Sequence, residues 1–487
     1  MLNRRNFLIT AGTSAVGLAT GAFGPLVGNT SGAEVKPEVV FGLDALPTEA
    51  AILEGTATDV WAYRGRVVSG STDQLAKIPD TYLGPVFKVK QGQRVRIHYR
   101  NNIPAESIVH WHGLHVPTDM DGHPRLVVPS GGEFTYDFTV TNRAGTYWYH
   151  PHPHGATGHQ VYGGMAGLFI VTDDEESALN LPEGDYDIPL VIQDRVFNRN
   201  NQLVYMAGGM RDRLNGVLGD TILVNGKPNY RISAESRPYR LRILNGSNAR
   251  VYDLAWSDDR PLFIIGNDGG LLESPVSRSH LLLGPGERVD VWADFSDDTR
   301  GSIAKLVSRP VFRGGGGFDL VRVDVEKKSA VRMPLPERLS RHRSLAVSDA
   351  VNAGAPKRFT LQMRHMRGVI NGRTFAMEDV AREEMVAMGT SEIWEFVNGG
   401  GHMGMNVPHP MHLHGLQFKI LKRAGVRHDG YLDAGWKDTV LIMPGEAVRI
   451  QARFADYPGL YLYHCHNLEH EDGGMMRNYF VSPDTHV

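Results

Sequence analysis

Histidines that could bind metal ions gather in four short segments of the 487-residue sequence: HWHG, HPHPHG, HPMHLHG and HCHNLEH. Each segment contains two histidines separated by one residue. Because residues two apart on a β-strand point to the same face, each pair presents two imidazoles side by side. Imidazole is a ligand for copper, zinc, iron and nickel. The segments therefore predict a site for several metal ions, with these candidate ligands: His110, His112, His150, His152, His409, His412, His414, His464, His466 and His470.

Cys465 is the only cysteine in the sequence, so no intramolecular disulfide can form. A lone cysteine is usually a small buried hydrophobic residue. Its neighbours favour a different interpretation, because a thiolate with two histidines and a weak axial methionine is typical of blue copper. His409, Cys465, His470 and Met475 can supply that set, although Met475 could also be an ordinary core methionine.

The segment HCH places the thiol of Cys465 between two histidines, His464 and His466. On a strand, Cys465 must point to the face opposite to both of them. An electron that arrives at a thiolate-bound copper then has only a few covalent bonds to cross to the imidazoles. This arrangement predicts electron relay between two metal centres.

The elements that position these residues are predicted to be short β-strands. One sequence pattern, a Pro-Gly-Glu-like turn followed by an alternating strand, occurs three times, as PSGGEFTYDFTV from Pro129, PGERVDVWADF from Pro285 and PGEAVRIQARF from Pro444. Period-two alternation in each copy indicates a strand with one apolar face. With 55 glycines and 27 prolines, the composition also fits many strands and tight turns. We predict an all-β protein.

The repeats divide the chain into β-sandwich domains at residues 40–175, 185–328 and 355–487. A connection rich in charge and proline, residues 326–357, separates the second domain from the third. Almost all the clustered histidines belong to the first and third domains, and the second has no candidate copper ligand. The shared metal site is therefore expected at the interface between domains one and three.

The formal net charge of -3 and a charged fraction of 22% do not resemble the basic surface of a nucleic-acid-binding protein. No nucleic-acid partner is expected. A small molecule or a metal ion is the more natural substrate.

The N-terminus is expected to be an export signal. Arg4 and Arg5 precede Phe7, Leu8 and a stretch without charge that runs to residue 33. This segment resembles a twin-arginine signal, which implies the twin-arginine export machinery as a partner and a final location in the periplasm or at the cell exterior. A membrane anchor is the alternative, but the many Gly, Ser and Thr residues make the stretch weakly apolar. We expect residues 1–33 to be removed and no stable membrane anchor to remain.

Over essentially the whole mature sequence, the chain resembles three-domain multicopper oxidases of the laccase and bacterial cuprous oxidase type. The four histidine motifs occur in the order that this family has. The resemblance implies three cupredoxin-like Greek-key domains and four copper ions, and it implies that dioxygen is reduced to water. His409, Cys465, His470 and axial Met475 would hold the type 1 copper, and the first histidines of HWHG and HLHG, His110 and His412, the type 2 copper. The type 3 pair would take His112, His150, His152, His414, His464 and His466.

Two carboxylates match family positions that assist proton delivery, Asp121 after HWHG and Glu471 directly after His470. Their catalytic role rests on the resemblance. Other histidines and two tryptophans near the motifs are interpreted as structural or surface residues: His115, His123, His154, His159, His402, Trp111 and Trp148.

The electron donor is left open by the sequence. Cuprous oxidases of this family carry a methionine-rich insertion, which is missing here, and Met405 and Val407 replace their Asp and Met before HPMHLHG. Because thioethers suit Cu(I), four methionines could still form a weaker metal site or could simply pack: Met363, Met366, Met403 and Met405. Phenols and aromatic amines are the donors expected of a laccase.

Three alternatives differ from the laccase-like interpretation. A dedicated cuprous oxidase would use the methionines for copper tolerance. A copper nitrite reductase shares the cupredoxin domain but lacks the four histidine pairs. A cell-envelope scaffold protein of the same fold would have lost its copper ligands, whereas all the motif histidines and Cys465 are present here.

Overall fold

The computed structural model describes residues 36–312, 316–364, 367–399, 407–426 and 428–484. Residues 37–487 form one compact unit. The predicted signal, residues 1–33, lies outside the described residues. Among the described residues, no helix is long and apolar enough to cross a membrane.

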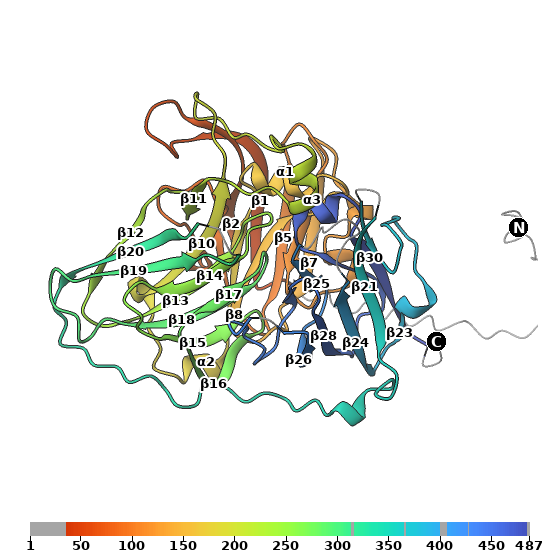
Figure 1. The fold of residues 1–487 in the computed structure, drawn as a ribbon. Helices are drawn as coiled ribbons and strands as arrows, with labels where there is room; N and C mark the ends of the chain where they lie inside the picture. The colour runs from red at the N-terminus through yellow and green to blue at the C-terminus, as the bar shows by residue number, and fades with distance from the viewer. Residues whose placement is uncertain (1–35, 313–315, 365–366, 400–406, 427, 485–487) are drawn as a thin grey trace, which may run out of the picture. The chain divides into compact units, whose positions relative to one another are not determined.

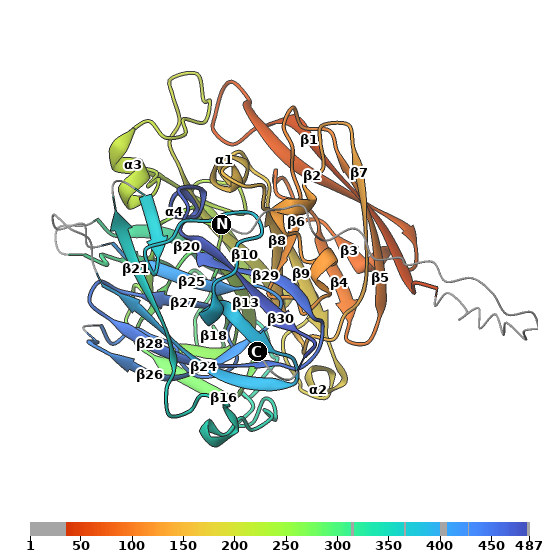
Figure 2. The same ribbon diagram turned by 90° about the vertical axis from the view of Figure 1, so that its right-hand side faces the viewer.

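The described residues form six β-sheets in three consecutive pairs along the chain, coloured red to yellow, yellow-green to green, and teal to blue in Figures 1 and 2. In each pair, the two sheets bury a common hydrophobic core, such as the one around Phe87 and Trp111 in the first pair. Each pair is thus a β-sandwich, and the prediction of an all-β fold is confirmed.

The first sandwich spans 39–172. One sheet has the order β2 (Thr58–Ser69), β1 (Val39–Ala50), β5 (Arg94–Asn101) and β7 (Glu133–Thr139). The other has the order β3 (Leu75–Ala76), β4 (Val86–Lys90), β9 (Gly167–Thr172), β8 (Gly145–Pro151) and β6 (Val109–His112).

The second sandwich spans 187–327. Its larger sheet has the order β11 (Thr221–Val224), β10 (Asp187–Arg195), β13 (Pro238–Asn245), β18 (Arg288–Asp294), β15 (Leu262–Asn267) and β16 (Gly270–Arg278). The smaller has the order β12 (Tyr230–Glu235), β20 (Phe318–Lys327), β19 (Ile303–Arg309), β14 (Tyr252–Trp256) and β17 (Leu281–Leu283).

The third sandwich spans 357–482. One sheet has the order β22 (Arg367–Ile370), β21 (Lys357–Arg364), β24 (Thr390–Asn398), β28 (Ala447–Phe454) and β26 (Phe418–Ala424). The other has the order β23 (Met385–Ala387), β30 (Met476–Ser482), β29 (Gly459–Cys465), β25 (His409–Leu413) and β27 (Thr439–Ile442).

Short helices occupy the connections. The α-helices are α1 (Thr157–Tyr162), α2 (Asp174–Ser177), α3 (Met210–Asn215) and α4 (Leu468–Asp472). The 3-10 helices are Thr72–Gln74, Thr118–Met120, Pro124–Leu126, Gly184–Tyr186, Val347–Asp349 and Arg382–Glu384. Helix α4 packs against both α1 and α3, so segments far apart in the sequence meet next to the HCH motif.

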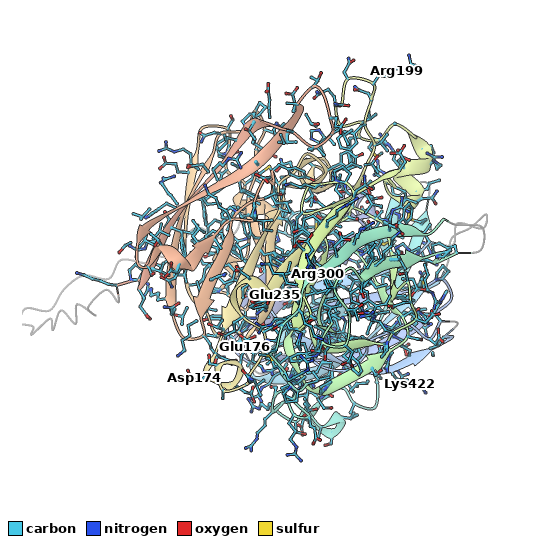
Figure 3. The ribbon with its side chains drawn as sticks, turned by 90° about the vertical axis from the view of Figure 1, so that its left-hand side faces the viewer. Asp174, Glu176, Arg199, Glu235, Arg300 and Lys422 are labelled. Carbon is cyan, nitrogen blue, oxygen red and sulfur yellow. The ribbon has the colours of Figure 1, made fainter. Side chains whose placement is uncertain are left out.

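The repeated sequence pattern has the same structural role in all three sandwiches. Its strands β7, β18 and β28 each pair antiparallel with an earlier strand, namely β5, β13 and β24 respectively. The second copy departs from the expectation of a single buried face, because six of the seven residues of β18 are buried. Polar side chains of β18 and of its partner strand β13 are buried as ion pairs: Arg240 binds Asp290 at 2.6 Å, and Arg242 binds Asp187 at 2.7 Å. Glu176 on α2, labelled in Figure 3, also binds Arg240.

Candidate metal centres

Strand pairing brings the predicted histidines together. β6 pairs antiparallel with β8, so that His110 lies opposite His150, and β25 pairs with β29, so that His412 lies opposite His464. Side chains directly opposite in an antiparallel pair share one face of the sheet. His112 follows His110 at the same-face spacing. The two sheets thus present their imidazoles as adjacent groups.

The histidines of the first and third sandwiches meet in one cluster. The ring of His110 stacks on His414 with 3.6 Å between centroids, and His112 stacks on His412 at 3.7 Å. The Nε2 atoms of His414 and His464 are 3.0 Å apart. The eight members are fully buried: His110, His112, His150, His152, His412, His414, His464 and His466. Neither sandwich could assemble this cluster alone.

Burial keeps His150 and His152 in the form that binds metals. Burial, with a smaller contribution from neighbouring imidazoles, lowers the pKa of His150 to about 3 and that of His152 to about 4. A neutral imidazole offers a free nitrogen lone pair, which a protonated ring does not. At neutral pH these side chains are therefore ready ligands.

Several ring nitrogens of the cluster have no hydrogen-bond partner. They are Nδ1 of His112, Nε2 of His150, Nδ1 of His152 and both nitrogens of His466. An unsatisfied buried polar atom costs about 1–3 kcal/mol. Triplets such as His110, His112 and His150 offer ligand atoms within 4.8 Å of one another. The residues present thus fit bound metal ions, which would satisfy these nitrogens.

A second candidate centre lies beside the cluster. Sγ of Cys465 is 3.4 Å from Nδ1 of His409 and 3.7 Å from Nδ1 of His470, and all three residues are buried. Burial raises the pKa of the Cys465 thiol, so a metal ion must displace its proton. Soft sulfur with two imidazoles suits copper.

Helix α4 and the turn that follows it position the remaining residues of this centre. The side chain of Asn467 caps α4 by accepting a hydrogen bond from the backbone of His470 at 3.4 Å. Met475 is fully buried, and its carbonyl accepts a hydrogen bond from the backbone of Cys465 at 3.0 Å. Gly368 leaves room for it, since a Cβ there would lie 2.5 Å from the Cβ of Met475. The structure thus ties the backbone of Met475 to that of Cys465 within one buried core, and the role of Met475 as axial ligand stays a prediction.

Asp121 holds two cluster histidines from different sandwiches. Nδ1 of His414 donates to its Oδ2 at 2.7 Å, and Nδ1 of His110 donates to its backbone carbonyl at 2.7 Å. Such contacts fix the ring orientation of a ligand. Burial raises the pKa of Asp121.

Glu471 contacts the other side of the cluster. Its carboxylate oxygens lie 3.1 Å from Nδ1 of His464 and 3.4 Å from Nε2 of His152. Burial opposes ionisation of Glu471, but the facing imidazoles outweigh it and lower its pKa. The structure thus brings both predicted carboxylates into contact with predicted ligands.

Sequence reasoning missed a carboxylate and an arginine at the cluster. Oδ1 of Asp438 is 3.0 Å from Nε2 of His112, and its backbone carbonyl accepts a hydrogen bond from Nδ1 of His412. Arg288, at the start of β18 in the second sandwich, binds both carboxylate oxygens of Asp438 at 2.7 and 2.6 Å. The sequence feature that could have indicated this contact was Arg288, a charged residue directly after the Pro-Gly-Glu turn of the second domain.

A glycine of the HWHG motif makes room for this ion pair. Gly113 has φ +86, and a Cβ there would lie 2.4 Å from Oδ2 of Asp438 and 2.8 Å from Nη2 of Arg288. A glycine at the end of this motif is therefore required by the ion pair between Arg288 and Asp438, and not by metal binding.

The histidines interpreted as bystanders have other partners or are exposed. His115 Nε2 lies 2.6 Å from Asp456, and His123 Nε2 lies 3.0 Å from Asn478. His154 and His159 are exposed. His402 lies outside the described residues, as do Met366, Met403 and Met405.

The two tryptophans and the remaining methionine are packed. The ring of Trp148 lies 4.3 Å from that of His150 and 5.0 Å from that of His112, between centroids. Trp111 is buried in the first core and Met363 in the third.

Comparison with known proteins assigns the family. The chain matches multicopper oxidase family profiles over residues 61–176 and 350–485. It is 34% identical to a multicopper oxidase of Staphylococcus haemolyticus, over 81% of each chain, and 30% identical to a laccase of Bacillus subtilis, over 89% of this chain and 97% of that one. The structure of the McoA multicopper oxidase of Aquifex aeolicus superposes with a TM-score of 0.80 at 37% identity, covering 92% of this chain and 97% of that one.

The chain belongs to the multicopper oxidase family. The predictions of family, cupredoxin-like fold and copper-dependent oxidoreductase class are confirmed.

Proposed function

We propose that this chain is a laccase-like enzyme that removes single electrons from phenolic, aromatic or metal-ion donors and passes them to dioxygen, which is reduced to water. One observation carries the proposal. In His464–Cys465–His466, the thiol faces His409 and His470, while its two neighbours belong to the buried histidine cluster. Electrons collected at the thiol are thus delivered at the cluster over a single stretch of backbone.

The proposed cofactor content is four copper ions. His409, Cys465 and His470, with Met475, would hold type 1 copper, and His110 with His412 type 2 copper. The type 3 pair would take His112, His150, His152, His414, His464 and His466. When bound, these ions supply the one-electron redox chemistry and the place where dioxygen binds.

Dioxygen reduction consumes protons, and the proposal gives that task to Asp121 and Glu471. Each carboxylate touches a histidine of the cluster through Nδ1, as described above. A proton held on Asp121 is therefore one hydrogen bond from a ligand ring, and a proton held on Glu471 lies within about 3.1 Å of another.

Donors are proposed to approach a cavity of about 460 Å³ that His470 lines. Its other lining residues include Phe375, Arg213 and Met363. Nε2 of His470 donates to the carbonyl of Leu214 at 2.8 Å, which holds the ring edge in place. An aromatic and partly apolar wall suits phenols. The Met363 thioether keeps Cu(I) as the second candidate donor.

Residues 1–33 are proposed to be a twin-arginine signal that is removed after export. Support comes from Arg4, Arg5 and the stretch without charge that follows them. Replacing both arginines with lysine should retain the protein in the cytoplasm when it is produced with its own N-terminus. Undiminished periplasmic protein in that variant would refute the export route.

The functional test is dioxygen uptake by the copper-loaded mature protein with a phenolic donor or with Cu(I), under identical conditions. Preference for the phenol supports the laccase-like proposal, and strong preference for Cu(I) supports a cuprous oxidase. Failure to retain copper after loading would refute the enzyme and favour a scaffold role.

A further inference from the structure

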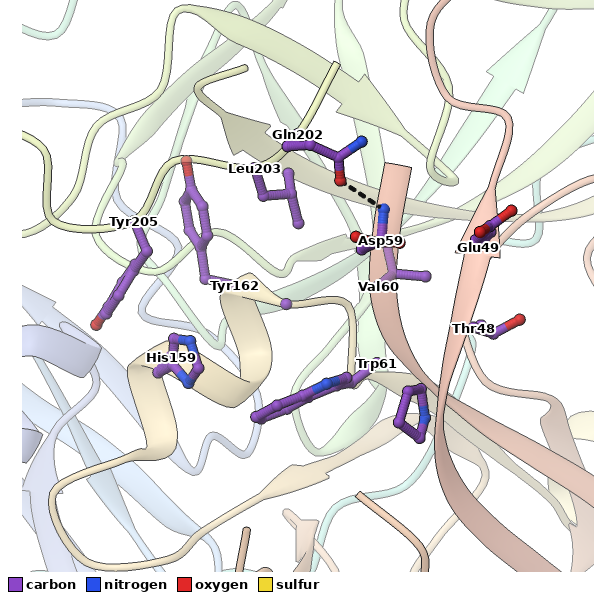
Figure 4. Close-up of a pocket in the computed structure, with 12 residues that line it drawn as sticks. Thr48, Glu49, Asp59, Val60, Trp61, His159, Tyr162, Gln202, Leu203 and Tyr205 are labelled. Atoms are coloured by element: carbon purple, nitrogen blue, oxygen red, sulfur yellow. Dashed lines mark hydrogen bonds between the residues drawn. The ribbon is translucent and has the colours of Figure 1, made fainter. Parts of the chain in front are cut away.

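A second cavity, of about 600 Å³, adjoins the cavity at His470. Figure 4 shows its walls, which come from β1 (Thr48, Glu49), β2 (Asp59–Trp61), helix α1 and the segment around Leu203. All its lining residues belong to the described chain. The two cavities share His159 and Tyr205, so the side chains of these residues separate one cavity from the other.

Aromatic rings form the inner wall of this cavity. The ring of Trp61 meets that of His159 edge to face at 5.2 Å between centroids, and Tyr205 lies 5.5 Å from His159 and 5.1 Å from Tyr162. Tyr162 is fixed, because its hydroxyl accepts from Val196 at 2.7 Å and donates to a backbone carbonyl. The backbone of Trp61 is tied to α1 by a hydrogen bond to Gly163. Preorganised ring faces attract flat aromatic groups and organic cations.

Two carboxylates stand at one side of the cavity. Glu49 and Asp59 are direct cross-strand partners in the β1–β2 pair, and both are exposed. No described basic side chain forms an ion pair with either of them, and no lysine or arginine lines the cavity. Like charges directly opposite on a sheet are destabilising. A ligand with a positive charge would relieve that repulsion while its aromatic part meets the rings.

Tyr205 connects the cavity with the Cys465 centre. Its ring lies in the aromatic wall, whereas its hydroxyl donates to Oε1 of Glu469 at 3.0 Å. Glu469 is held by two further hydrogen bonds, from the backbone of Val217 and from Asn248. The next residue is His470, a proposed ligand. The path from the cavity to His470 therefore consists of the Tyr205 ring, its hydrogen bond to Glu469, the Glu469 side chain and the peptide unit that joins Glu469 to His470.

We propose that this cavity binds a cationic aromatic amine as a second electron-donor site, with Tyr205 as the contact that conducts the electron towards His470. The inference rests on the proposed oxidase function. Each bound donor loses one electron and becomes a radical with one additional positive charge, and Tyr205 keeps its proton. Four such oxidations, with four protons from solvent, reduce one dioxygen to two water molecules.

Binding is tested with two matched probes and the copper-loaded protein, fully reduced under argon so that no turnover occurs. The cationic probe is 2-(4-aminophenoxy)ethyl-trimethylammonium, and the neutral probe is 4-(3,3-dimethylbutoxy)aniline, in which a tert-butyl group replaces the ammonium. Calorimetry should show tighter binding of the cation. Glu49→Gln with Asp59→Asn should weaken the cation about fivefold to tenfold and leave the neutral probe unchanged.

Glu54→Gln is the matched control, because Glu54 is exposed in the same hairpin but does not line the cavity. Trp61→Ala should weaken both probes. Equal binding of the two probes, or no effect of the paired neutralisation on the cation, would overturn the site. Because Glu49 and Asp59 repel each other, their neutralisation should not lower the melting temperature.

Electron delivery is tested with Tyr205→Phe, which keeps the ring and removes the hydrogen bond to Glu469. The affinity for the cationic probe should stay within about twofold of the unmodified protein. The anaerobic rate at which that probe bleaches the blue colour should fall several-fold more than the rate with 2,6-dimethoxyphenol, whose proposed cavity Tyr205 also lines. An unchanged rate for the cation would overturn the route through Tyr205. Failure of the unmodified protein to oxidise the phenol would instead refute the oxidase proposal.

Discussion

The histidine cluster and the interior of the second sandwich satisfy buried polar groups in opposite ways. In the second sandwich, Arg240 and Arg242 are neutralised by Asp290 and Asp187 within hydrogen-bond distance. In the cluster, buried ring nitrogens such as Nε2 of His150 have no hydrogen-bond partner among the described residues. The three sandwiches share one repeated sequence pattern, so the fold alone does not decide which of them contributes to a reactive site. Unpaired ligand atoms mark the interface between the first and third sandwiches as the reactive region.

The second sandwich nevertheless supports the cluster. Arg288 binds Asp438, which contacts His112, and Gly286 of the same turn lies so close to His466 that a Cβ there would be 3.0 Å from its ring. A domain without ligands thus fixes ligands of its neighbours. The following changes test this division of roles, from the largest expected effect to the smallest.

Arg288→Met should separate the two regions most clearly. It leaves Asp438 buried without its ion pair, which costs about 3–5 kcal/mol of unfolding free energy. The cluster should lose copper, while the blue colour at Cys465 persists. Metal analysis measures the copper content, and electron paramagnetic resonance measures the type 2 copper signal. Arg240→Met is the control, because it breaks a buried pair of the second sandwich away from the cluster. Arg240→Met should destabilise the protein to a similar extent but leave its copper content unchanged. Copper loss in both variants would contradict the distinction between the cluster and the interior of the second sandwich.

Asp121→Asn should slow dioxygen reduction by about 100-fold or more, the range for loss of a proton-transfer group. Anaerobic bleaching of the blue colour by a phenol should keep its rate, because that step involves only the Cys465 centre. Stopped-flow spectroscopy measures both rates on one sample. Equal slowing of the two steps would show that Asp121 acts on the structure as a whole.

Gly113→Ala should destabilise the protein by about 1–3 kcal/mol, since a side chain at positive φ is strained and this one also meets Asp438. Thermal unfolding with and without copper measures the effect. Gly92→Ala is the matched control, because Gly92 has φ +92 and no atom lies within 4 Å of its added Cβ. A loss no greater than that of the control would mean that the contact with Asp438 is unimportant.

His154→Ala should have the smallest effect, within about 0.5 kcal/mol in stability, because His154 is exposed. Its copper content should equal that of the unmodified protein. A missing copper ion would instead add His154 to the ligands.

The sequence was sufficient for what depends on short spacing. His-x-His pairs, the HCH order and the alternating strands predicted β-sandwich domains and the residues that the structure gathers, because a strand fixes the faces of residues one and two apart. The cupredoxin-like form of these domains was implied by the family resemblance. Contacts between distant segments could not be predicted in this way. Arg288 meets Asp438 across 150 positions, and Tyr205 meets Glu469 across 264. Alternation was also misleading in β18, where Asp290 on the expected polar face is buried in an ion pair with Arg240.

The central claim is that electrons enter at Cys465 and leave at the histidine cluster. The most direct measurement is dioxygen uptake with a phenolic donor by copper-loaded Cys465→Ser, alongside its circular dichroism and copper content. We predict loss of the blue colour and of turnover in a folded protein that keeps the copper of the cluster. Retained turnover in that variant would contradict the relay through Cys465.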